Sequence, residues 1–438
     1  MQRTGEEPMN IREEAGKMKL DAPVMASSSL QMRNAALEAV RDALIAGKDE
    51  IFAANARDMA AAEDAGISGA IKKRLKFDEG KMRDVLAGLD ELIRLPDPLG
   101  KTSLARELDE GLKLYRVSVP IGVIGVIFEA RPDALVQISS LCIKSGNCAI
   151  LKGGRETAET NRTLFRIIYG AAAGAGLPKG CLLQAELHNE IDELLSCDRD
   201  VDLLIPRGSN QFVQYIMNHT KIPVMGHADG VCHIYVDRAA DREASIPVIL
   251  DAKTQYPAAC NAVETILIDR RAADDFLPAL AEAFARAKVA MRGTKEASER
   301  IVRLGYDCVE MAEEEFHKEY LDLTVSIKLV SGVREAVEHI NRFGSHHTDS
   351  ILTEDDEAAE YFMQMVDSAG VYRNCSTRFA DGYRYGFGAE VGISTGKLHA
   401  RGPVGLEGLV TYKYKLYGEG HIVGDYAAGR RQFHFRDL

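Results

Sequence analysis

From about residue 117 onward, short apolar segments alternate with amphipathic ones, and this alternation restricts the folds open to the chain. In the first series the pattern predicts strands at 123–128, 148–151, 182–185 and 201–205, and helices at 133–145, 160–173, 189–196 and 211–217. A second series predicts strands at 263–268, 325–330, 350–352 and 370–373, with helices at 272–287, 333–342 and 355–366. Repeated βαβ units build mostly parallel sheets covered by helices. The sequence therefore predicts an α/β protein.

The length of the chain requires more than one core. At 438 residues it exceeds what a single hydrophobic core usually serves, so two or three domains are expected. Residues 1 to about 25 are polar and predict a loose leader, and two helices follow, ending near Gly47 and Gly66. The segment 95–100, with two prolines and a glycine, breaks the chain before the first series.

Charge and composition exclude several classes of partner. The 54 Lys and Arg residues against 66 Asp and Glu leave a net charge of −12, which disfavours nucleic acid and anionic membranes because these bind basic surfaces. No apolar run approaches a membrane span, and the first 17 residues lack the pattern of a signal peptide. A cytoplasmic protein acting on a small molecule is expected, with its eight scattered cysteines reduced.

Two pairs of adjacent residues suggest a metal but do not complete a site. Cys232-His233 and His346-His347 contain ligand types, yet neighbouring residues rarely converge on one ion and no ligand spacing completes a set. We predict no metal.

Cys260 is the strongest candidate for catalysis. It lies in a loop of small residues with Gln255 and Pro257, directly before the apolar strand predicted at 263–268. Backbone N–H groups in such a loop can stabilise a thiolate or an oxyanion. The alternative is a buried structural cysteine, which is what most intracellular cysteines are.

The chain lacks the usual dinucleotide fingerprint, since no Gly-x-Gly-x-x-Gly follows a strand. Instead, Lys152 stands at the carboxyl end of a predicted strand, where ligands bind in open α/β sheets. Gly208 and Ser209 occupy the equivalent place after the strand at 201–205. Such residues are also common in loops that bind nothing.

Taken in order, these segments resemble the aldehyde dehydrogenase superfamily, and within it the gamma-glutamyl phosphate reductases. The resemblance runs from about Asp58 to Lys413. It is carried by the stretches 120–132, 226–233, 339–349 and 374–382, together with the Cys260 loop. It implies an aldehyde dehydrogenase-like α/β fold with two parallel-sheet domains and a small β oligomerisation element. The expected divisions are a cofactor-binding domain at 1–106 and 120–231, a catalytic domain at 232–400, and oligomerisation segments at 107–119 and 401–438.

The resemblance also implies the reaction, which is NADPH-dependent reduction of L-glutamate 5-phosphate to L-glutamate 5-semialdehyde with release of phosphate. This is the second step of proline biosynthesis from glutamate. Cys260 would attack the acyl phosphate to form a thioester, which hydride then reduces. By the same resemblance, Lys152 contacts the adenosine ribose, Gly208-Ser209 lies under the nicotinamide, and Glu319 meets the nicotinamide ribose. The choice of NADPH over NADH is inherited from the family.

One feature of hydrolytic relatives is missing. Those enzymes carry a glutamate that activates water against the thioester, whereas the corresponding segment here, Met225-Gly226-His227-Ala228-Asp229-Gly230, contains none. A thioester that should meet phosphate or hydride benefits from the loss of that base. The oxyanion asparagine of those relatives has no counterpart either, which leaves the Cys260 backbone N–H as the expected donor.

The substrate carries anionic and cationic groups, so its pocket needs both charges. Arg131 and the run Ser376-Thr377-Arg378 are candidates for binding phosphate or carboxylate. In the alternative, each arginine pairs with a nearby acid, such as Glu129, Asp133 or Asp381, and holds a loop. His347, Asp349 and Glu390 would hold the amino-acid end of the substrate or brace the cleft, and His227 would orient Cys260 or lie behind it.

A hairpin near residues 108–118 and a late strand near 408–414 normally build subunit contacts in this fold. Leu112, Leu114 and Val117, with Leu409, Val410 and Tyr412, would supply an apolar interface. A homodimer or tetramer is expected, with a glutamate 5-kinase as a further candidate partner. The alternatives are a hydrolytic or coenzyme A-acylating aldehyde dehydrogenase and, more distantly, a non-catalytic scaffold. The missing glutamate disfavours the hydrolytic enzyme and the intact Cys260 loop disfavours the scaffold.

Overall fold

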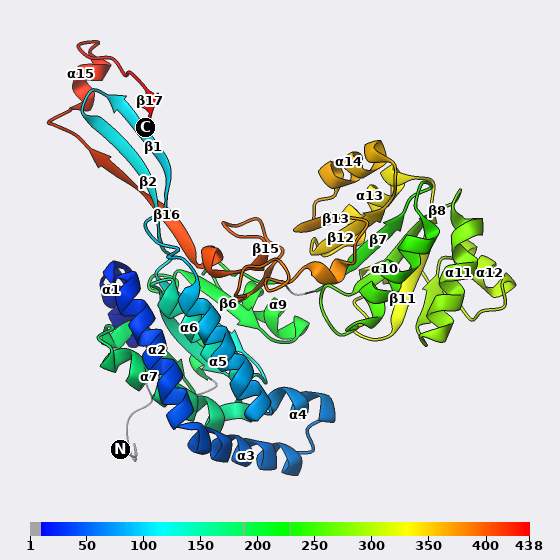
Figure 1. Ribbon diagram of the computed structural model, residues 1–438, viewed down its shortest axis with the longest axis horizontal. Coiled ribbons are helices and arrows are strands. Elements are labelled where there is room, and N and C mark those ends of the chain that lie inside the picture. The colour runs from blue at the N-terminus through cyan, green and yellow to red at the C-terminus, as the bar shows by residue number, and fades with distance from the viewer. Residues whose placement is uncertain (1–9, 187–188, 228) are drawn as a thin grey trace. The chain divides into compact units, whose positions relative to one another are not determined.

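A computed structural model describes residues 10–186, 189–227 and 229–438, and it divides into two compact units (Figure 1). The first unit comprises Met1–Met225, Phe387–Gly392 and Val404–Leu438, and the second comprises Gly226–Gly386 and Ile393–Pro403. The short strands β14 (Gly392–Ser394) and β15 (Gly402–Val404), which form a two-stranded sheet, stand where the chain passes between the units. Among the described residues, no helix combines the length and the apolar character needed to cross a membrane.

The first unit begins with helices rather than with a loose leader. Its first five helices are α1 (Ile11–Ser27), α2 (Leu30–Ala46), α3 (Lys48–Asp64), α4 (Gly69–Leu75) and α5 (Glu79–Arg94). The prediction of a leader to about residue 25 is therefore wrong from Ile11 onward, and residues 1–9 lie outside the described part. Helix α1 forms because the Asn10 side chain caps it and because apolar residues spaced three or four apart, from Ile11 to Met25, are buried.

A parallel four-stranded sheet forms the centre of the first unit. Its order is β5-β4-β3-β6, from β3 (Val123–Phe128), β4 (Cys148–Gly153), β5 (Leu182–Ala185) and β6 (Leu203–Arg207). The helices of this series are α6 (Pro132–Lys144), α7 (Ala158–Gly174), α8 (Asn189–Leu195) and α9 (Asn210–Asn218), with the short turns η1 (Arg155–Thr157) and η2 (Lys179–Cys181). The predicted order of strands and helices in this series is confirmed, with β6 beginning two residues later than expected. All six residues of β3 are buried, as the continuous apolar run predicts for a central parallel strand.

A second sheet extends from the helical part of the first unit (Figure 1). Its order is β16-β2-β1-β17, from β1 (Thr102–Asp109), β2 (Leu112–Pro120), β16 (Val410–Tyr417) and β17 (Arg436–Asp437). The turn η5 (Leu406–Leu409) leads into β16, and α15 (Val423–Ala427) follows it. Strand β16 pairs with β2 in antiparallel register, with Tyr412 opposite Ser118. The four large side chains Tyr412, Tyr414, Leu416 and Tyr417 of this edge strand are each 55–58% exposed.

The second unit is a seven-stranded, all-parallel sheet with the order β10-β9-β11-β8-β7-β12-β13. The strands are β7 (Cys232–Val236), β8 (Val263–Asp269), β9 (Ala290–Gly293), β10 (Val309–Glu310), β11 (Thr324–Val330), β12 (Thr348–Leu352) and β13 (Gly370–Arg373). The helices are α10 (Arg242–Thr254), α11 (Ala273–Arg286), α12 (Lys295–Arg303), α13 (Val333–Phe343) and α14 (Asp356–Met365), with turns η3 (Glu313–His317) and η4 (Thr377–Phe379). Five of these elements, β7, β9, β10, α10 and α12, were not predicted.

Side chains of alternating direction along the strands build two cores on opposite faces of this sheet. Ile234 and Val236 of β7 pack in one cluster with Phe276 of α11. Tyr235, between them, packs in the other cluster with Ile340 of α13 and Phe362 of α14. Helices therefore cover both faces, as expected for a parallel sheet. Side chains that are accessible to a ligand must then lie in the loops at the ends of the strands.

Candidate functional site

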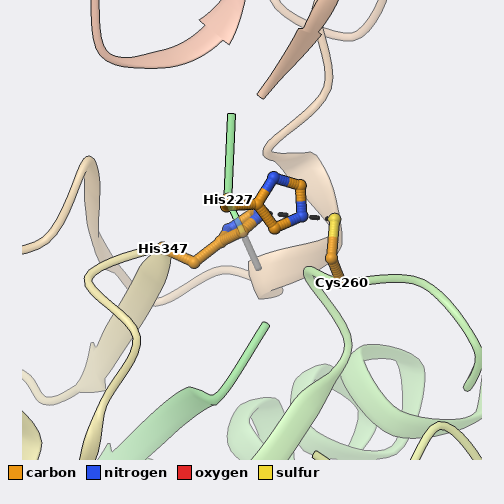
Figure 2. A group of neighbouring side chains, drawn as sticks. All are labelled: His227, Cys260 and His347. Carbon is orange, nitrogen blue, oxygen red and sulfur yellow. Dashed lines mark hydrogen bonds between the residues drawn. The ribbon is translucent and has the colours of Figure 1, made fainter. Parts of the chain in front are cut away.

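Three loops of the second unit meet at the edge of the sheet where its strands begin. Strands β8, β7 and β12 are adjacent and parallel, so the segments that precede them lie at one edge. Cys260 precedes β8, His227 precedes β7, and His347 directly precedes β12. The side chains of these three residues gather around one sulfur atom (Figure 2).

The Cys260 loop is a pair of tight turns between α10 and β8. Tyr256 precedes a proline, which disfavours the helical conformation, and α10 ends just before it at Thr254. The N–H of Ala259 then donates to the carbonyl of Tyr256 at 3.2 Å, and the N–H of Ala262 donates to that of Ala259 at 2.9 Å. These turns leave Cys260 half-buried, whereas Cys232 beneath it is fully buried. The Cys232 thiol donates to the carbonyl of Cys260 at 3.4 Å.

A histidine lies against the thiol. His347 Nε2 is 3.2 Å from Cys260 Sγ, and His347 Nδ1 is 2.9 Å from the Thr348 hydroxyl. The ring of His227 meets that of His347 edge to face at 5.1 Å between centroids, and its Nδ1 lies 3.0 Å from the carbonyl of Ile393. A thiol in contact with an imidazole has a partner for its proton, which is the arrangement of an activated nucleophile.

Gly230 allows the backbone of the β7 loop to lie directly against Cys260. A Cβ atom at Gly230 would stand 2.1 Å from the carbonyl oxygen of Cys260 and 2.5 Å from its Cα. Both distances are far inside van der Waals contact, and the atoms met are backbone, which cannot rotate away. The position of Cys260 therefore depends on the missing side chain of residue 230.

A buried ion pair underlies the loop on its other side. Lys253 Nζ at the end of α10 lies 2.8 Å from Glu264 Oε2 on β8, and both side chains are at most 1% exposed. Burial raises the pKa of Glu264 to about 7, although the Lys253 ammonium acts in the opposite direction. The pair joins the two elements that flank Cys260.

The segment after β13 packs against the Cys260 loop, and it contains three of the predicted substrate residues. Thr377 is buried and donates from Oγ1 to the carbonyl of Asn261 at 2.7 Å, while the buried Ser376 hydroxyl accepts from the N–H of Arg378. Arg378 is 8% exposed and donates from Nε to the Gln255 amide oxygen at 3.0 Å. Burial lowers the pKa of Arg378, the neighbouring Arg384 acts in the same direction, and the charge of Cys260 opposes them. The guanidinium thus lies within electrostatic range of the thiol.

The acids considered as alternative partners for the two arginines also contact other groups, and the charge of Asp381 acts on Arg378. Asp381 lies 3.7 Å from Arg384, Asp133 accepts from Lys81 at 3.0 Å, and Glu129 accepts from the N–H of Ser209 at 2.9 Å. Arg131 is exposed at the start of α6, in the first unit.

Asp349 lies in the core of the second unit rather than among exposed groups. Its Oδ1 accepts from the N–H of His233 at 2.8 Å and from the ring Nδ1 at 2.9 Å, and its Oδ2 accepts from the Ser368 hydroxyl. The carboxylate is fully buried. Of the two roles considered for this residue, its burial favours bracing, and it locks β12 to β7 just behind His347.

The predicted cofactor residues of the first unit lie where β3, β4 and β6 end together. Phe128, Gly153 and Arg207 are paired across these strands. Lys152 is buried and donates to the carbonyls of Gly153 and Glu186 at 2.9 and 3.2 Å. Burial lowers the pKa of Lys152, with the Glu190 carboxylate opposing.

Three glycines and the start of α9 lie at this edge of the first unit. At Gly153, Gly154 and Gly208 an added Cβ would meet the side chains of Asn161, Glu156 and Glu129 at 2.0–2.5 Å, so neighbouring side chains pack directly against the backbone there. Gly208 and Ser209 are exposed, and α9 starts at the next residue without a side-chain cap. The start of a helix favours anions, and here the Glu129 carboxylate accepts from the N–H of Ser209 at 2.9 Å. Lys152 and the start of α9 are the groups at this edge that suit the phosphates of a dinucleotide.

Glu319 belongs to the second unit, half-buried in the loop after η3, and its charge acts on Glu264. The second unit thus brings together Cys260, His347, Ser376, Thr377 and Arg378, while Lys152, Gly208, Ser209 and Arg131 belong to the first unit. Nothing in the spacing along the chain predicts the contact between His347 and Cys260. His347 directly precedes β12, which lies two strands from β8 with β7 between them, so the contact could be inferred only with β7, which the sequence pattern does not predict.

The chain is similar to proteins of a known family. A family model described as "Aldehyde dehydrogenase family" matches residues 6–299. A gamma-glutamyl phosphate reductase of Pelotomaculum thermopropionicum is 51% identical over 98% of this chain and 98% of its own length. The gamma-glutamyl phosphate reductase 1 of Synechocystis sp. is 54% identical over 93% of both chains. The crystal structure of a gamma-glutamyl phosphate reductase from Thermotoga maritima is 36% identical and matches with a TM-score of 0.91, covering 94% of this chain and all of that one.

Proposed function

This chain belongs to the aldehyde dehydrogenase family, among its gamma-glutamyl phosphate reductases, and we propose that it reduces L-glutamate 5-phosphate to L-glutamate 5-semialdehyde with NADPH and releases phosphate. The observation that carries the proposal is the half-buried Cys260 thiol with His347 Nε2 at 3.2 Å. The reaction is the proline-biosynthesis step that the names of the relatives indicate.

Cys260 is the nucleophile of this reaction. His347 accepts the thiol proton at Nε2, while Thr348 holds the other ring nitrogen and so fixes the direction of the ring. The thiolate attacks the acyl carbon, the C–O bond to phosphate breaks, and a thioester forms on Cys260. Its backbone N–H stabilises the oxyanion that develops, since the side-chain amide of the next residue, Asn261, donates instead to the carbonyl of Ala380 at 2.9 Å.

Arg378 attracts the anionic end of the substrate toward the thiol. Its guanidinium is largely desolvated, which strengthens its attraction for a phosphate or carboxylate, and it lies in electrostatic range of Cys260. Ser376 and Thr377 hold its backbone in place through the bonds to Arg378 N and Asn261 O. Arg131 remains a second proposed anion ligand, from the first unit.

The first unit holds NADPH at the ends of β3, β4 and β6. Lys152 contacts the adenosine ribose and offers its charge to a 2′-phosphate, and Gly208 with Ser209 forms the turn under the nicotinamide. Glu319 is proposed for the nicotinamide ribose. When bound, NADPH supplies the hydride that reduces the thioester. A site without a water-activating glutamate keeps the thioester from hydrolysis until then.

The exposed edge strand β16 is proposed as the surface through which the chain forms a homodimer or tetramer. Its apolar side chains, Tyr412, Tyr414 and Leu416, are more than half exposed beside the paired strand β2. We further propose a cytoplasmic location, consistent with the free thiols of all eight cysteines. A glutamate 5-kinase is the proposed source of the unstable acyl phosphate.

The test is NADPH oxidation with kinase-generated glutamyl phosphate, together with the phosphate-requiring reverse reaction, in wild type and Cys260→Ala. Wild type should turn over, Cys260→Ala should not, and mass spectrometry of quenched wild type should locate an acyl adduct on Cys260. The control Cys308→Ser removes another half-buried thiol of the second unit and should keep full activity. Full activity in Cys260→Ala would refute the mechanism, and reverse reaction without phosphate would refute the substrate.

A further inference from the structure

The side chains of His227, Cys260 and His347 form a ligand set for a transition metal. One nitrogen or sulfur atom from each lies within 4.8 Å of the others, and no other group of three or more such residues was found in the described part of the chain. Two imidazoles and a thiolate are the donors that Zn²⁺ prefers. We propose that this cluster binds Zn²⁺, and that the bound ion holds the enzyme inactive by occupying its nucleophile.

Two of the three ligand atoms already have nearly the separation of a zinc site. With Zn–S of about 2.3 Å and Zn–N of about 2.0–2.1 Å, a tetrahedral ion separates its sulfur and nitrogen ligands by roughly 3.5 Å. Cys260 Sγ and His347 Nε2 are 3.2 Å apart, so an entering ion widens this contact by only a few tenths of an ångström. The two rings meet nearly at right angles, 82° between planes, and both approach the sulfur (Figure 2).

The hydrogen bonds at Nδ1 of His227 and His347 leave Nε2 as the metal-binding nitrogen of each ring. The carbonyl of Ile393 can only accept, so His227 Nδ1 carries the proton and donates to it at 3.0 Å. In the neutral ring, Nε2 then bears the lone pair that a metal requires. His347 Nδ1 is likewise engaged by the Thr348 hydroxyl, and its Nε2 faces the sulfur. Metal-bound histidines characteristically have such a partner on the second ring nitrogen, where it fixes the tautomer and the ring direction.

The consequence for activity rests on the proposed function. Zn²⁺ displaces the thiol proton to solvent and forms a Zn–S bond with the sulfur lone pair that would otherwise attack the acyl phosphate. Three protein ligands leave the fourth tetrahedral position to water. The zinc-bound form and the thioester form are therefore mutually exclusive, and removal of the ion restores the free thiol unchanged.

Metal binding is tested apart from turnover with Co²⁺, which replaces Zn²⁺ and is coloured. The full-length chain, reduced with a phosphine and freed of metal, is titrated with Co²⁺. We expect a thiolate-to-cobalt absorption band in the near ultraviolet and the visible bands of tetrahedral Co²⁺, both removed by added Zn²⁺. The thiolate band should vanish in Cys260→Ser. In His227→Ala the affinity should fall by at least the roughly 10–100-fold that loss of an outer-shell partner costs.

Matched controls are Cys308→Ser and His219→Gln, which remove a half-buried thiol and an exposed histidine outside the cluster and should leave the spectrum unchanged. A thiolate band that persists in Cys260→Ser, or no band in wild type, would overturn the metal site whether or not the enzyme is active. Zn²⁺ should then inhibit NADPH oxidation and block alkylation of Cys260, with both reversed by a chelator. If the cobalt spectrum is as expected but the protein does not oxidise NADPH with glutamyl phosphate, the metal site is supported and only the proposed function is refuted.

Discussion

Replacing Gly230 by alanine should inactivate the enzyme without unfolding it. The added Cβ would stand 2.1 Å from the carbonyl oxygen of Cys260, 2.5 Å from its Cα and 2.6 Å from its carbonyl carbon. Ordinary contact begins at 3.4 Å, so the two backbone segments must separate by about 1 Å or more. The contact between Cys260 Sγ and His347 Nε2, at 3.2 Å, cannot survive that displacement.

The expected loss follows from the displacement. A misplacement of about 1 Å in a reacting group costs on the order of 10²-fold in rate, so kcat/KM for glutamyl phosphate should fall about 100-fold. Crowding of this kind costs about 1–3 kcal/mol of stability, which a chain of this size tolerates. The Tm should therefore fall by a few degrees while the circular dichroism spectrum stays that of wild type.

The assay combines NADPH oxidation with the rate at which iodoacetamide alkylates Cys260, followed by mass spectrometry. Both rates should fall together in Gly230→Ala. The matched control is Gly396→Ala, also in the second unit, where the nearest atom to an added Cβ is 3.9 Å away and both rates should stay unchanged. A Gly230→Ala variant with wild-type kcat/KM would refute the reasoning that this glycine positions the thiol.

Four further outcomes are expected. His347→Ala should lower kcat/KM about 10²–10⁴-fold at neutral pH and slow alkylation of Cys260, because the thiol loses its proton acceptor, and unchanged alkylation would contradict that role. Lys253→Met should lower the free energy of unfolding by about 3–5 kcal/mol, because it leaves the Glu264 carboxyl buried without its partner. The double variant Lys253→Met with Glu264→Met should regain most of that free energy, and denaturant titration of both variants measures the difference. Burial lowers the pKa of His339 from 6.5 to about 2, and the charge of His233 acts in the same direction. Below pH 6.5 His339 is therefore protonated in the unfolded chain but stays neutral in the folded chain. Stability is then full above pH 6.5 and falls by about 2 kcal/mol between pH 7 and pH 5, and His339→Leu should abolish that part of the fall in denaturant titrations. Light scattering should find wild type at a multiple of 48 kDa and Tyr412→Lys with Leu416→Lys at a lower mass; wild type at 48 kDa alone would reject the assembly.

The parts of the fold that could be predicted are those in which local pattern and final environment agree. The strands at 123–128 and 263–268 are continuous apolar runs because both of their faces are covered, and both appear within a residue of their predicted bounds. Helix α10 was missed because Pro247 interrupts it and its apolar residues do not form one stripe. Strand β7 was missed because Cys232 and His233 suggested a ligand, although both are buried in the core.

The site divides in the same way. Cys260 could be singled out as a candidate because its loop combines small residues with a proline before an apolar strand, and because the surrounding segments resemble the aldehyde dehydrogenases. Its partner His347 lies 87 positions further along the chain, and the pairings of β12 with β7 and of β7 with β8 bring it to the sulfur. The need for glycine at 230 is also non-local, since it arises from the backbone of residue 260. Such contacts follow from topology, which a pattern of neighbouring residues does not contain.

The pairing of β2 with β16 has a consequence for the newly made chain. Strand β2 ends at Pro120, and the strand that covers its edge begins only at Val410, after the whole seven-stranded sheet has been synthesised. At roughly 5–20 residues per second, the covering strand follows on the order of 15–60 s later. During that interval the edge of β2 in the nascent chain is unpaired, and an unpaired strand edge promotes aggregation. Protection of this edge during synthesis is therefore a requirement that the folded structure does not reveal.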